Sequence, residues 1–302
     1  MSITCRKGAV TALRFKEWDS LVMFSKREFI IWWSYKMNAL MWVLDTLFTT
    51  VIFFMLSLVT RGSDVSFFPY GGNYVSFVVL GLFVYFISFT NLGDPYPRVS
   101  RIYWGGTMDL YLLSPLSYFT PMLGIMFRGV IDDYPRSVLA LLFGWLFFGA
   151  VFTFHAPFTL LLILILILIS TFGIGMISAS SFYLLDFKQQ TEPVKFIFQD
   201  VIIALTAGYY YPITVLPYQL QVLGSFIPHT YALDALRRLM IPGGDTLTPV
   251  LPLQLAMQNI KPITLDILVL ILMSAVFMPI GWFLYVKGIE RARRDGTLTR
   301  WQ

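Results

Sequence analysis

The sequence predicts an all-α integral membrane protein with six transmembrane helices. Of its 302 residues, 57% are hydrophobic and 13% are charged, whereas soluble domains carry about 25% charged residues. The mean hydropathy is +0.71, and several apolar runs reach the length of about 20 residues that a helix needs to cross a bilayer. Between these runs there is no room for a soluble domain of useful size.

The six spans follow from the apolar runs in chain order. The run 160–169 contains only Leu and Ile and is the least ambiguous membrane signal. Small residues follow it, and two of them, Gly175 and Ala179, are four apart, which allows close approach of another helix. The spans are predicted at residues 38–59, 74–92, 136–154, 158–185, from 194 onward, and 264–286, so that residues 38–286 form the transmembrane domain.

Residues 1–37 are predicted to form a cytoplasmic N-terminus with an amphipathic helix in the membrane interface. Its apolar side chains recur at helical spacing, with charged residues mostly elsewhere. The pattern fits a lipid-surface anchor, and it also fits a helix that touches a cytoplasmic partner. The apolar positions are Trp18, Leu21, Val22, Phe29, Trp32 and Trp33.

Basic residues gather on one side of the predicted spans. They precede the first span, lie between spans two and three and between four and five, and fill the tail 287–302, while the opposite side has only Arg61, Arg237, Arg238 and Lys261. The positive-inside rule then places both termini in the cytoplasm of a multi-pass protein of the cytoplasmic membrane, with a basic tail. Because these residues lie beside apolar runs, they are orientation signals, and no nucleic acid is expected as a partner.

The segment between spans two and three predicts a short cytoplasmic helix. Thr107 is a plausible N-cap, and Asp109 in the first turn is favoured by the helix dipole. Pro115 ends the helix, and Gly105-Gly106 provides the turn before it. A membrane protein without its own motor needs such a rigid contact if a soluble motor is to push it.

The fifth apolar run does not stay helical. Gly208 and three prolines, Pro212, Pro217 and Pro228, interrupt residues 207–238, and each proline removes a hydrogen-bond donor and clashes with the preceding turn. Broken backbone at membrane depth persists only where protein or a water-lined cavity satisfies the freed groups. Such segments are typical of transport machinery.

Catalytic and metal-binding patterns are not found. One cysteine excludes an internal disulfide, two histidines are too few for a histidine metal cluster, and no G-x-x-x-x-G-K-[ST] loop is present to hold ATP phosphates. His229, Asp234 and Ser225 share the broken segment, so an interfacial enzyme is kept as a minor alternative. A capping or packing role for His229 at a helix start is favoured over that alternative.

Three further charged sites are open to more than one interpretation. Residues 128–136 carry two arginines and two aspartates at helical spacing, which favours a self-neutralised collar at the end of span three over a force-transmitting hinge. Asp200 lies either near the cytoplasmic interface or in a paired position inside a dimer or a pathway. Asp45 in span one is a similar case.

Two stretches resemble the permease subunits of ABC-2 type transporters. Residues 105–116 are similar to the family's Gly-Thr-Leu-Glu…Leu-Leu-Ser-Pro coupling region, with Asp109 in place of Glu. Residues 211–237 are similar to its pattern of aromatic-Pro, Leu-Pro, Pro-x-x-Tyr-Ala and a final arginine. The resemblance extends over essentially the whole chain.

The resemblance implies a transport subunit, without catalytic residues or a cofactor of its own, that forms a dimer in the lipid bilayer, most simply a homodimer. Two copies of a cytoplasmic ABC ATPase would bind ATP and Mg and push a coupling segment. The implied coupling residues are Arg101, Trp104, Gly105, Gly106, Thr107, Asp109, Leu110, Leu113, Ser114 and Pro115. The implied outer gate, made of short broken helices, includes Tyr209, Tyr210, Tyr211, Pro212, Leu216, Pro217, Pro228 and Tyr231.

The cargo is expected to be hydrophobic or amphipathic, either drug-like or lipid-like. Aromatic residues make up 17% of the chain, which suits apolar cargo, although aromatic rings also stack on sugars and populate membrane interfaces. A polysaccharide or glycolipid exporter of the same family is the first alternative. A secondary carrier without a motor is a weaker one.

Overall fold

The computed structural model describes residues 36–59, 70, 74–106, 119–185, 196–244 and 248–296, together with single residues between 19 and 34. These residues are almost entirely helical, and none of them forms a strand. Most of the predicted amphipathic helix, including Trp18, Leu21, Trp32 and Trp33, lies outside them. Of its other apolar positions, Val22 and Phe29 are both about half exposed, at 50% and 49%.

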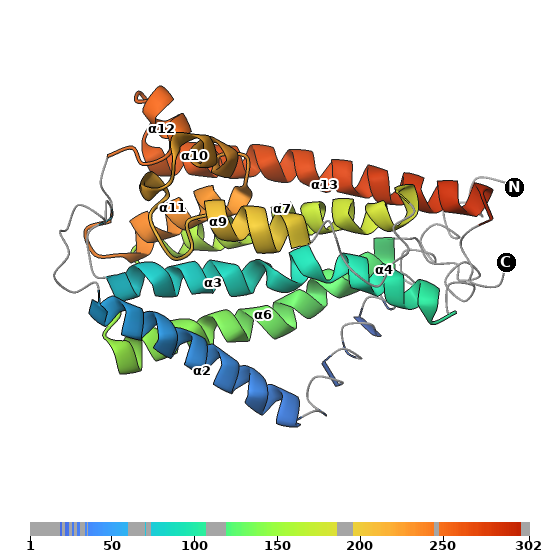
Figure 1. Ribbon diagram of the computed structural model, residues 1–302, viewed down its shortest axis with the longest axis horizontal. Coiled ribbons are helices and arrows are strands. Elements are labelled where there is room, and N and C mark those ends of the chain that lie inside the picture. The colour runs from blue at the N-terminus through green and yellow to red at the C-terminus, as the bar shows by residue number, and fades with distance from the viewer. Residues whose placement is uncertain are drawn as a thin grey trace, which may run out of the picture.

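The described part of the chain has five long helices, of which four run alongside one another while α2 slants away from them (Figure 1). They are α2 (Lys36–Val59), α3 (Tyr74–Gly93), α6 (Phe119–Phe148), α7 (Pro157–Leu184) and α13 (Pro262–Arg294). Among the described residues, three helical stretches are long and apolar enough to cross a membrane, namely Tyr74–Trp104, Pro157–Leu184 and Pro262–Arg294. The described part of the chain is therefore all-helical, with membrane-spanning character.

Seven shorter elements complete the described fold. One of them, α4, follows α3 after a bend at Asp94, and the others form the broken region between α7 and α13. Their bounds are α4 (Pro95–Trp104), the π-helix η2 (Phe196–Ile203), α9 (Ala204–Thr206), the 3-10 helix η3 (Ile213–Val215), α10 (Tyr218–Gly224), α11 (Pro228–Met240) and α12 (Pro252–Ala256).

The third predicted span differs most from the observed helix. The sequence placed its membrane part at 136–154, whereas α6 begins at Phe119, passes through Pro135 and ends at Phe148. The charged residues that suggested a boundary lie inside the helix. Two of them have partners on other elements: Arg128 pairs with Asp94, on the bend before α4, at 3.6 Å, and Arg136 pairs with Asp45 on α2. Two of the four members of the predicted collar thus bind other elements.

Glycines let the long helices pack closely. A Cβ at Gly173 of α7 would lie 2.5 Å from the Phe277 carbonyl carbon of α13, and a Cβ at Gly281 would lie 2.3 Å from the Gly173 carbonyl oxygen. A Cβ at Gly175 would lie 2.3 Å from the carbonyl oxygen of Asn91 on α3. The small residues predicted in the fourth span are therefore packing positions within this chain.

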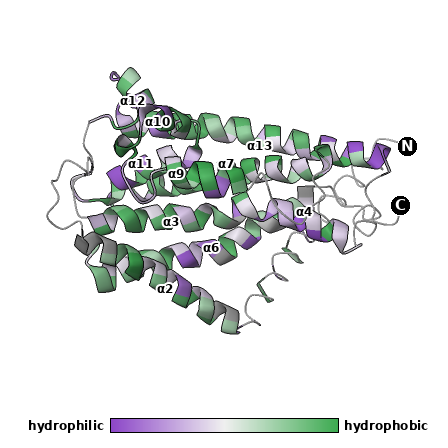
Figure 2. Cartoon of the chain, in the orientation of Figure 1, coloured by the Kyte–Doolittle hydropathy of each residue, from purple (hydrophilic) through white to green (hydrophobic). Residues whose placement is uncertain are grey.

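The bundle has two different ends. At one end, called here the α11 end, α10, α11 and α12 cover the long helices, and at the other, called the α4 end, lie α4 and the last turns of α13 (Figure 1). Hydrophilic residues are concentrated along α4 and the end of α13, whereas the middle of the long helices is mostly hydrophobic (Figure 2). The predicted outer segment maps to the α11 end, and the described part of the predicted coupling segment, residues 101–106, maps to the α4 end.

Candidate functional site

The break in the fifth apolar run occurs where the sequence predicts it. The helical stretch η2–α9 ends at Thr206, and Gly208 takes a left-handed conformation with φ of 78°. Beyond it, Tyr209 passes so close to α3 that a Cβ at Gly81 would lie 2.0 Å from the Tyr209 carbonyl oxygen. Glycine is needed at both positions, for the backbone angle at one and for the contact at the other.

Arg237 satisfies the backbone groups that the break leaves without helical partners. Its Nη2 donates to the carbonyl oxygens of Gly208 at 2.8 Å, Tyr209 at 3.1 Å and Phe77 at 3.3 Å. The guanidinium lies 3.4 Å from the centroid of the Phe77 ring, a favourable cation–π contact. Arg237 thus binds the freed carbonyls of Gly208 and Tyr209 and joins them to α3.

Beside it, Asp234 is the centre of a buried polar network. Its carboxylate accepts hydrogen bonds from the Tyr70 hydroxyl at 2.5 Å, Arg238 Nε at 2.7 Å and Gln254 Nε2 at 2.7 Å. Burial would raise the pKa of Asp234, but a hydrogen bond with Asp266, the positive charge of Arg238 and the hydrogen bonds from Arg238 and Tyr70 hold that pKa below its ordinary value. Asp234 is therefore an ionised, fully partnered side chain, which removing any one donor would disturb.

Gln254 extends this network from α11 to α12 and α13. Its Nε2 also donates to Asp266 Oδ1 of α13 at 2.7 Å, and its Oε1 accepts from the backbone N–H groups of Val250 at 2.9 Å and Leu251 at 3.2 Å. Arg238 in turn donates to the carbonyl oxygen of Thr248 at 2.9 Å. One glutamine side chain thereby joins the start of α13 to the short helices that precede it.

The predicted gate residues all lie at the α11 end, but they do not form one cluster of exposed side chains. Tyr209 is buried between Tyr85 and His229, and Tyr210 stacks on Phe53 of α2 with ring centroids 4.5 Å apart. The hydroxyl groups of Tyr211 and Tyr231 donate to the carbonyl oxygens of Leu205 and Ser225, respectively. Pro212 and Pro228 are buried, Leu216 is half-buried and Pro217 is exposed.

The prolines of this segment start the short helices. Pro212 precedes η3, Pro217 is the N-cap of α10, and Pro228 occupies the first turn of α11. Proline is favoured at these positions because the first helical N–H groups have no intrahelical acceptor and its φ suits a helix. The three prolines thus divide the segment into short helices instead of leaving it irregular.

His229 packs in the interior and does not cap a helix. Its ring meets the Tyr209 ring edge-on, with centroids 6.0 Å apart, and its Nδ1 has no hydrogen-bond partner among the described residues. The N-cap of α11 is Ile227, so the capping part of the sequence interpretation is wrong. Burial lowers the pKa of His229 to about 3, which keeps the ring neutral near pH 7.

The residues considered for a serine–histidine–carboxylate site are engaged elsewhere. The Ser225 hydroxyl donates to the carbonyl oxygen of Gln221 at 3.0 Å. The carboxylate of Asp234 accepts hydrogen bonds from Tyr70, Arg238 and Gln254. The His229 Nδ1 is hydrogen-bonded neither to this carboxylate nor to the Ser225 hydroxyl. The geometry does not bring the three side chains together as a triad.

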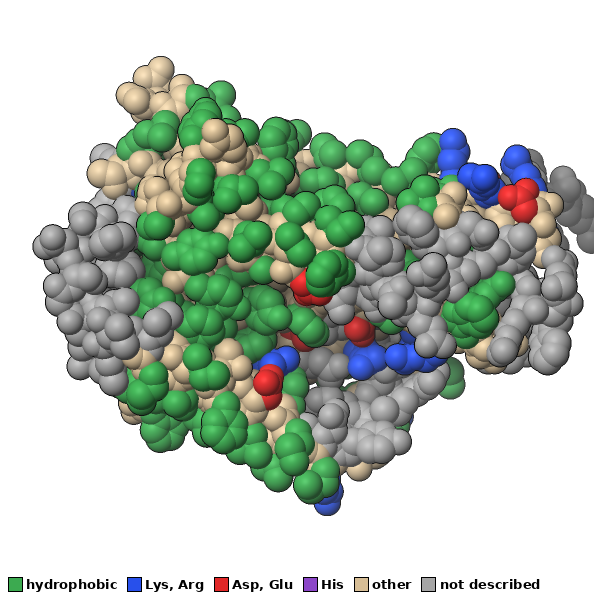
Figure 3. Space-filling model, in the orientation of Figure 1, with side chains coloured by type: hydrophobic (Ala, Val, Ile, Leu, Met, Phe, Trp, Pro, Cys, Tyr) green, Lys and Arg blue, Asp and Glu red, His purple; other side chains and the backbone are tan. Residues whose placement is uncertain are grey.

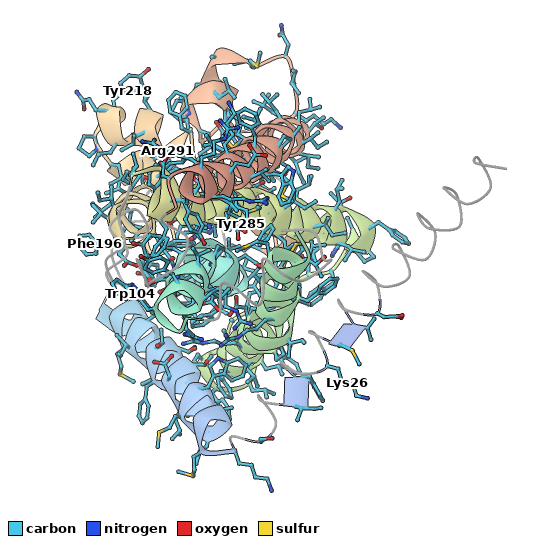
Figure 4. The ribbon with its side chains drawn as sticks, turned by 90° about the vertical axis from the view of Figure 1, so that its right-hand side faces the viewer. Lys26, Trp104, Phe196, Tyr218, Tyr285 and Arg291 are labelled. Carbon is cyan, nitrogen blue, oxygen red and sulfur yellow. The ribbon has the colours of Figure 1, made fainter. Side chains whose placement is uncertain are left out.

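The coupling residues that the structure describes lie at the α4 end. Arg101, Gly105 and Gly106 are exposed and Trp104 is 36% exposed. Gly105 ends α4 with its N–H donating to the Arg101 carbonyl oxygen at 2.9 Å, and Gly106 has φ of 64°. In the end-on view, Trp104 lies on the same flank of the bundle as Phe196 (Figure 4). Thr107, Asp109, Leu110, Leu113, Ser114 and Pro115 lie outside the described residues.

Sequence reasoning missed the partners of the α11 network. Tyr70, Gln254, Asp266 and Gly81 were not singled out, although each makes a close contact within the network or the break. The i, i+4 spacing of Asp234 and Arg238 was the available signal, because side chains four apart on a helix are neighbours. An aspartate at the start of a long apolar helix, Asp266, was a second signal.

Within the described ranges, no group of three or more His, Cys, Asp or Glu side chains is placed to hold a metal ion. Comparison of the chain with protein-family models, with curated proteins and with solved structures found no match.

Proposed function

We propose that the chain is the membrane-spanning permease subunit of an ATP-driven transporter of the ABC-2 type. One observation carries the proposal. The stretch 211–237 lies at the α11 end, and Gly105-Gly106, the described start of the other stretch, lies at the α4 end, with helices between them long and apolar enough to cross a membrane. A machine driven from one side needs its motor contact and its distal gate separated by the thickness of the membrane.

In this proposal α2, α3, α6, α7, η2–α9 and α13 are the six spans, and both termini lie in the cytoplasm. The α4 end then faces the cytoplasm and the α11 end faces outward. The exposed Trp104 and the Gly105-Gly106 turn, with residues 107–115, form the contact for the ATPase. The chain works as a dimer, most simply a homodimer, with two ATPase copies that bind ATP and Mg.

The cargo in this proposal is hydrophobic or amphipathic, and the direction is export. The Tyr209 ring lies 5.5 Å from the Tyr85 ring and 6.1 Å from the Tyr210 ring, centroid to centroid, which supports an apolar passage. Polysaccharide or glycolipid cargo is the alternative, because the same rings stack on sugars. A carrier driven by an ion gradient is a second candidate, favoured by Asp45 and Asp200, whose side chains are exposed on apolar helices.

The decisive experiment is affinity purification of the tagged chain in mild detergent. A co-purifying ATPase with a P-loop, whose hydrolysis is stimulated by lipophilic compounds, is the expected result. The purified chain alone should not hydrolyse ATP, and robust hydrolysis by this single polypeptide would contradict the proposal. Transport that follows an ion gradient without any ATPase would favour the carrier instead.

A further inference from the structure

Two carboxyl groups meet inside the α11 end, one from α11 and one from the start of α13. Gln254 Nε2 donates to Asp234 Oδ2 and to Asp266 Oδ1, at 2.7 Å in each case. These two oxygens can therefore be no more than 5.4 Å apart, which is twice that distance. A hydrogen bond also joins the two carboxyl groups directly. We call Asp234 and Asp266 the carboxyl pair.

The carboxyl pair connects the short helices of the α11 end to a helix long enough to cross a membrane. Asp234 lies on α11, Gln254 on α12 and Asp266 near the start of α13. None of these three residues is more than 2% exposed. Hydrophobic side chains cover much of the α11 end on the face shown in Figure 3. Since water does not hydrate either carboxyl group, the protein groups around the pair decide which of the two carries a charge.

The two members of the carboxyl pair have unequal partners. Asp234 accepts hydrogen bonds from three other side chains, among them the charged Arg238. Among the described residues, Gln254 is the one donor to Asp266, and Asp266 Oδ2 is buried without a hydrogen-bond partner. Donors and a neighbouring positive charge stabilise an ionised carboxylate, whereas burial without them favours the neutral acid. The negative charge of the pair therefore belongs on Asp234, and a proton belongs on Asp266.

The other charged and titratable groups near the pair are engaged elsewhere. In the described part of the chain they are Tyr70, Tyr231, Arg237 and Arg238. Tyr70 and Arg238 donate to Asp234. Arg237 donates to the carbonyl oxygens of the break, and the Tyr231 hydroxyl donates to a backbone carbonyl oxygen. A second negative charge on Asp266 would thus contact the charge of Asp234 with no cation bound to it, and two carboxylates so placed do not both ionise.

We propose that the carboxyl pair is a proton-binding site, which holds one proton on Asp266 at neutral pH and thereby joins α11 to α13. The Asp266 O–H donates to the Asp234 carboxylate, which has room for a fourth hydrogen bond beside its three. When this proton passes to water, two buried negative charges remain in contact and repel each other. The attachment of the α11 end to the start of α13 is therefore sensitive to pH and weakens as the pH rises. This inference does not depend on the proposed transport function.

Infrared spectroscopy of the full-length chain in lipid nanodiscs detects the proton directly. A protonated carboxyl group has a C=O stretching band that is separate from the bands of carboxylates and amides. The natural chain at neutral pH should show this band, and Asp266→Asn should lose the intensity of one carboxyl group. Asp295→Asn, which removes an exposed carboxylate at the far end of α13, is the matched control and should keep the band. A natural chain without the band, or an unchanged band in Asp266→Asn, would overturn the proposal.

The pH dependence of unfolding is a second test of the same proton. Unfolding exposes Asp266 to water, where an aspartate is ionised above about pH 5, so unfolding should release one proton. The unfolding constant of the natural chain, divided by that of Asp266→Asn, should therefore rise about tenfold per pH unit between about pH 5 and pH 7. His229 is present in both proteins and cancels from this ratio. A ratio that does not change with pH would contradict the proposal. If Asp266→Asn does not fold, the infrared spectrum of the natural chain still tests the proposal, since absence of the band there overturns it.

Discussion

Two aspartate–arginine pairs of the same spacing lie at opposite ends of this bundle and differ in burial. At the α11 end, Asp234 and Arg238 are 2.7 Å apart, and both side chains are 1% exposed. At the α4 end, Arg291 and Asp295 are 3.6 Å apart and are 62% and 56% exposed. Removing one partner of a buried ion pair strongly destabilises the fold, whereas an exposed ion pair contributes little to stability. The same i, i+4 spacing of opposite charges thus forms a buried structural pair at one end and a solvated surface pair at the other.

The contrast extends to the segments around the two pairs. At the α11 end, charged side chains bind partners inside the fold; for example, Arg237 donates hydrogen bonds to three carbonyl oxygens. At the α4 end, Arg101, Trp104 and the Gly105-Gly106 turn are exposed. We infer that internal contacts fix the structure of the α11 end, and we propose that the exposed residues of the α4 end contact another molecule.

The largest expected effect is the loss of the buried carboxylate. Asp234→Asn should lower the free energy of unfolding by about 3–5 kcal/mol, because it leaves the Arg238 charge buried without its partner. Asp295→Asn, in the exposed pair, should change it by less than about 1 kcal/mol. Unfolding in mixed detergent micelles measures both. Similar losses in the two variants would show that burial does not separate the two ends.

A second test concerns the close contact at the break. Gly81→Ala should lower the free energy of unfolding by about 1–3 kcal/mol, because the new methyl group would clash with the Tyr209 carbonyl oxygen and displace the broken segment. Gly288→Ala at the α4 end is the matched control. Its nearest neighbour, the Tyr183 Cβ, would be 3.1 Å away, and the helix-propensity gain of alanine offsets that contact. Thermal unfolding of both purified variants checks the ranking, and equal stability would contradict it.

A third test uses pH. The pKa of His229 is lowered to about 3 in the folded chain from its ordinary value of 6.5, so the unfolded chain binds the proton more readily. The neutral His229 ring therefore makes its full contribution to the free energy of unfolding above pH 6.5. This contribution is lost as the pH falls toward 3, by up to about 1.4 kcal/mol per pH unit.

His229→Phe keeps an aromatic ring against Tyr209 and removes the proton site. The stability of this variant should therefore fall less steeply than that of the natural chain between pH 6.5 and 4. The exposed His155 provides the control, since His155→Phe should retain the original slope. Identical slopes in all three proteins would mean that His229 is not protonated on unfolding in this range.

The smallest effect on stability, with a large effect on function, is expected at the predicted coupling segment. Because the proposed ATPase contact requires these positions to be on the surface, Leu110→Arg or Leu113→Arg should change the free energy of unfolding by less than about 0.5 kcal/mol. In the complex with the ATPase, hydrolysis should continue while transport stops. Transport assays in vesicles beside phosphate release measure the two activities, and unchanged transport would count against the coupling assignment.

The positions of most long helices could be predicted from the chain alone. α2, α3, α7 and α13 begin within a few residues of the apolar runs that predict them, and the fifth run breaks at Gly208 as expected. These features depend on local chemistry, namely the length of an apolar run and the backbone limits of proline and glycine. The count of six spans and the side of the membrane on which the termini lie stay predictions.

The partners of the charged residues were decided by the tertiary structure. Asp45 meets Arg136, 91 positions away, and Asp234 meets Tyr70, 164 positions away. Arg128 and Arg136 of α6 pair with other elements and need not mark a helix end, and the point at which the membrane part of this span begins stays a prediction. Composition and local pattern determine which segments become membrane helices, because the free-energy cost of exposing apolar surface and unpaired backbone groups depends on the residues of each segment alone. Which charges those helices tolerate depends on distant side chains, and only the packed bundle brings them together.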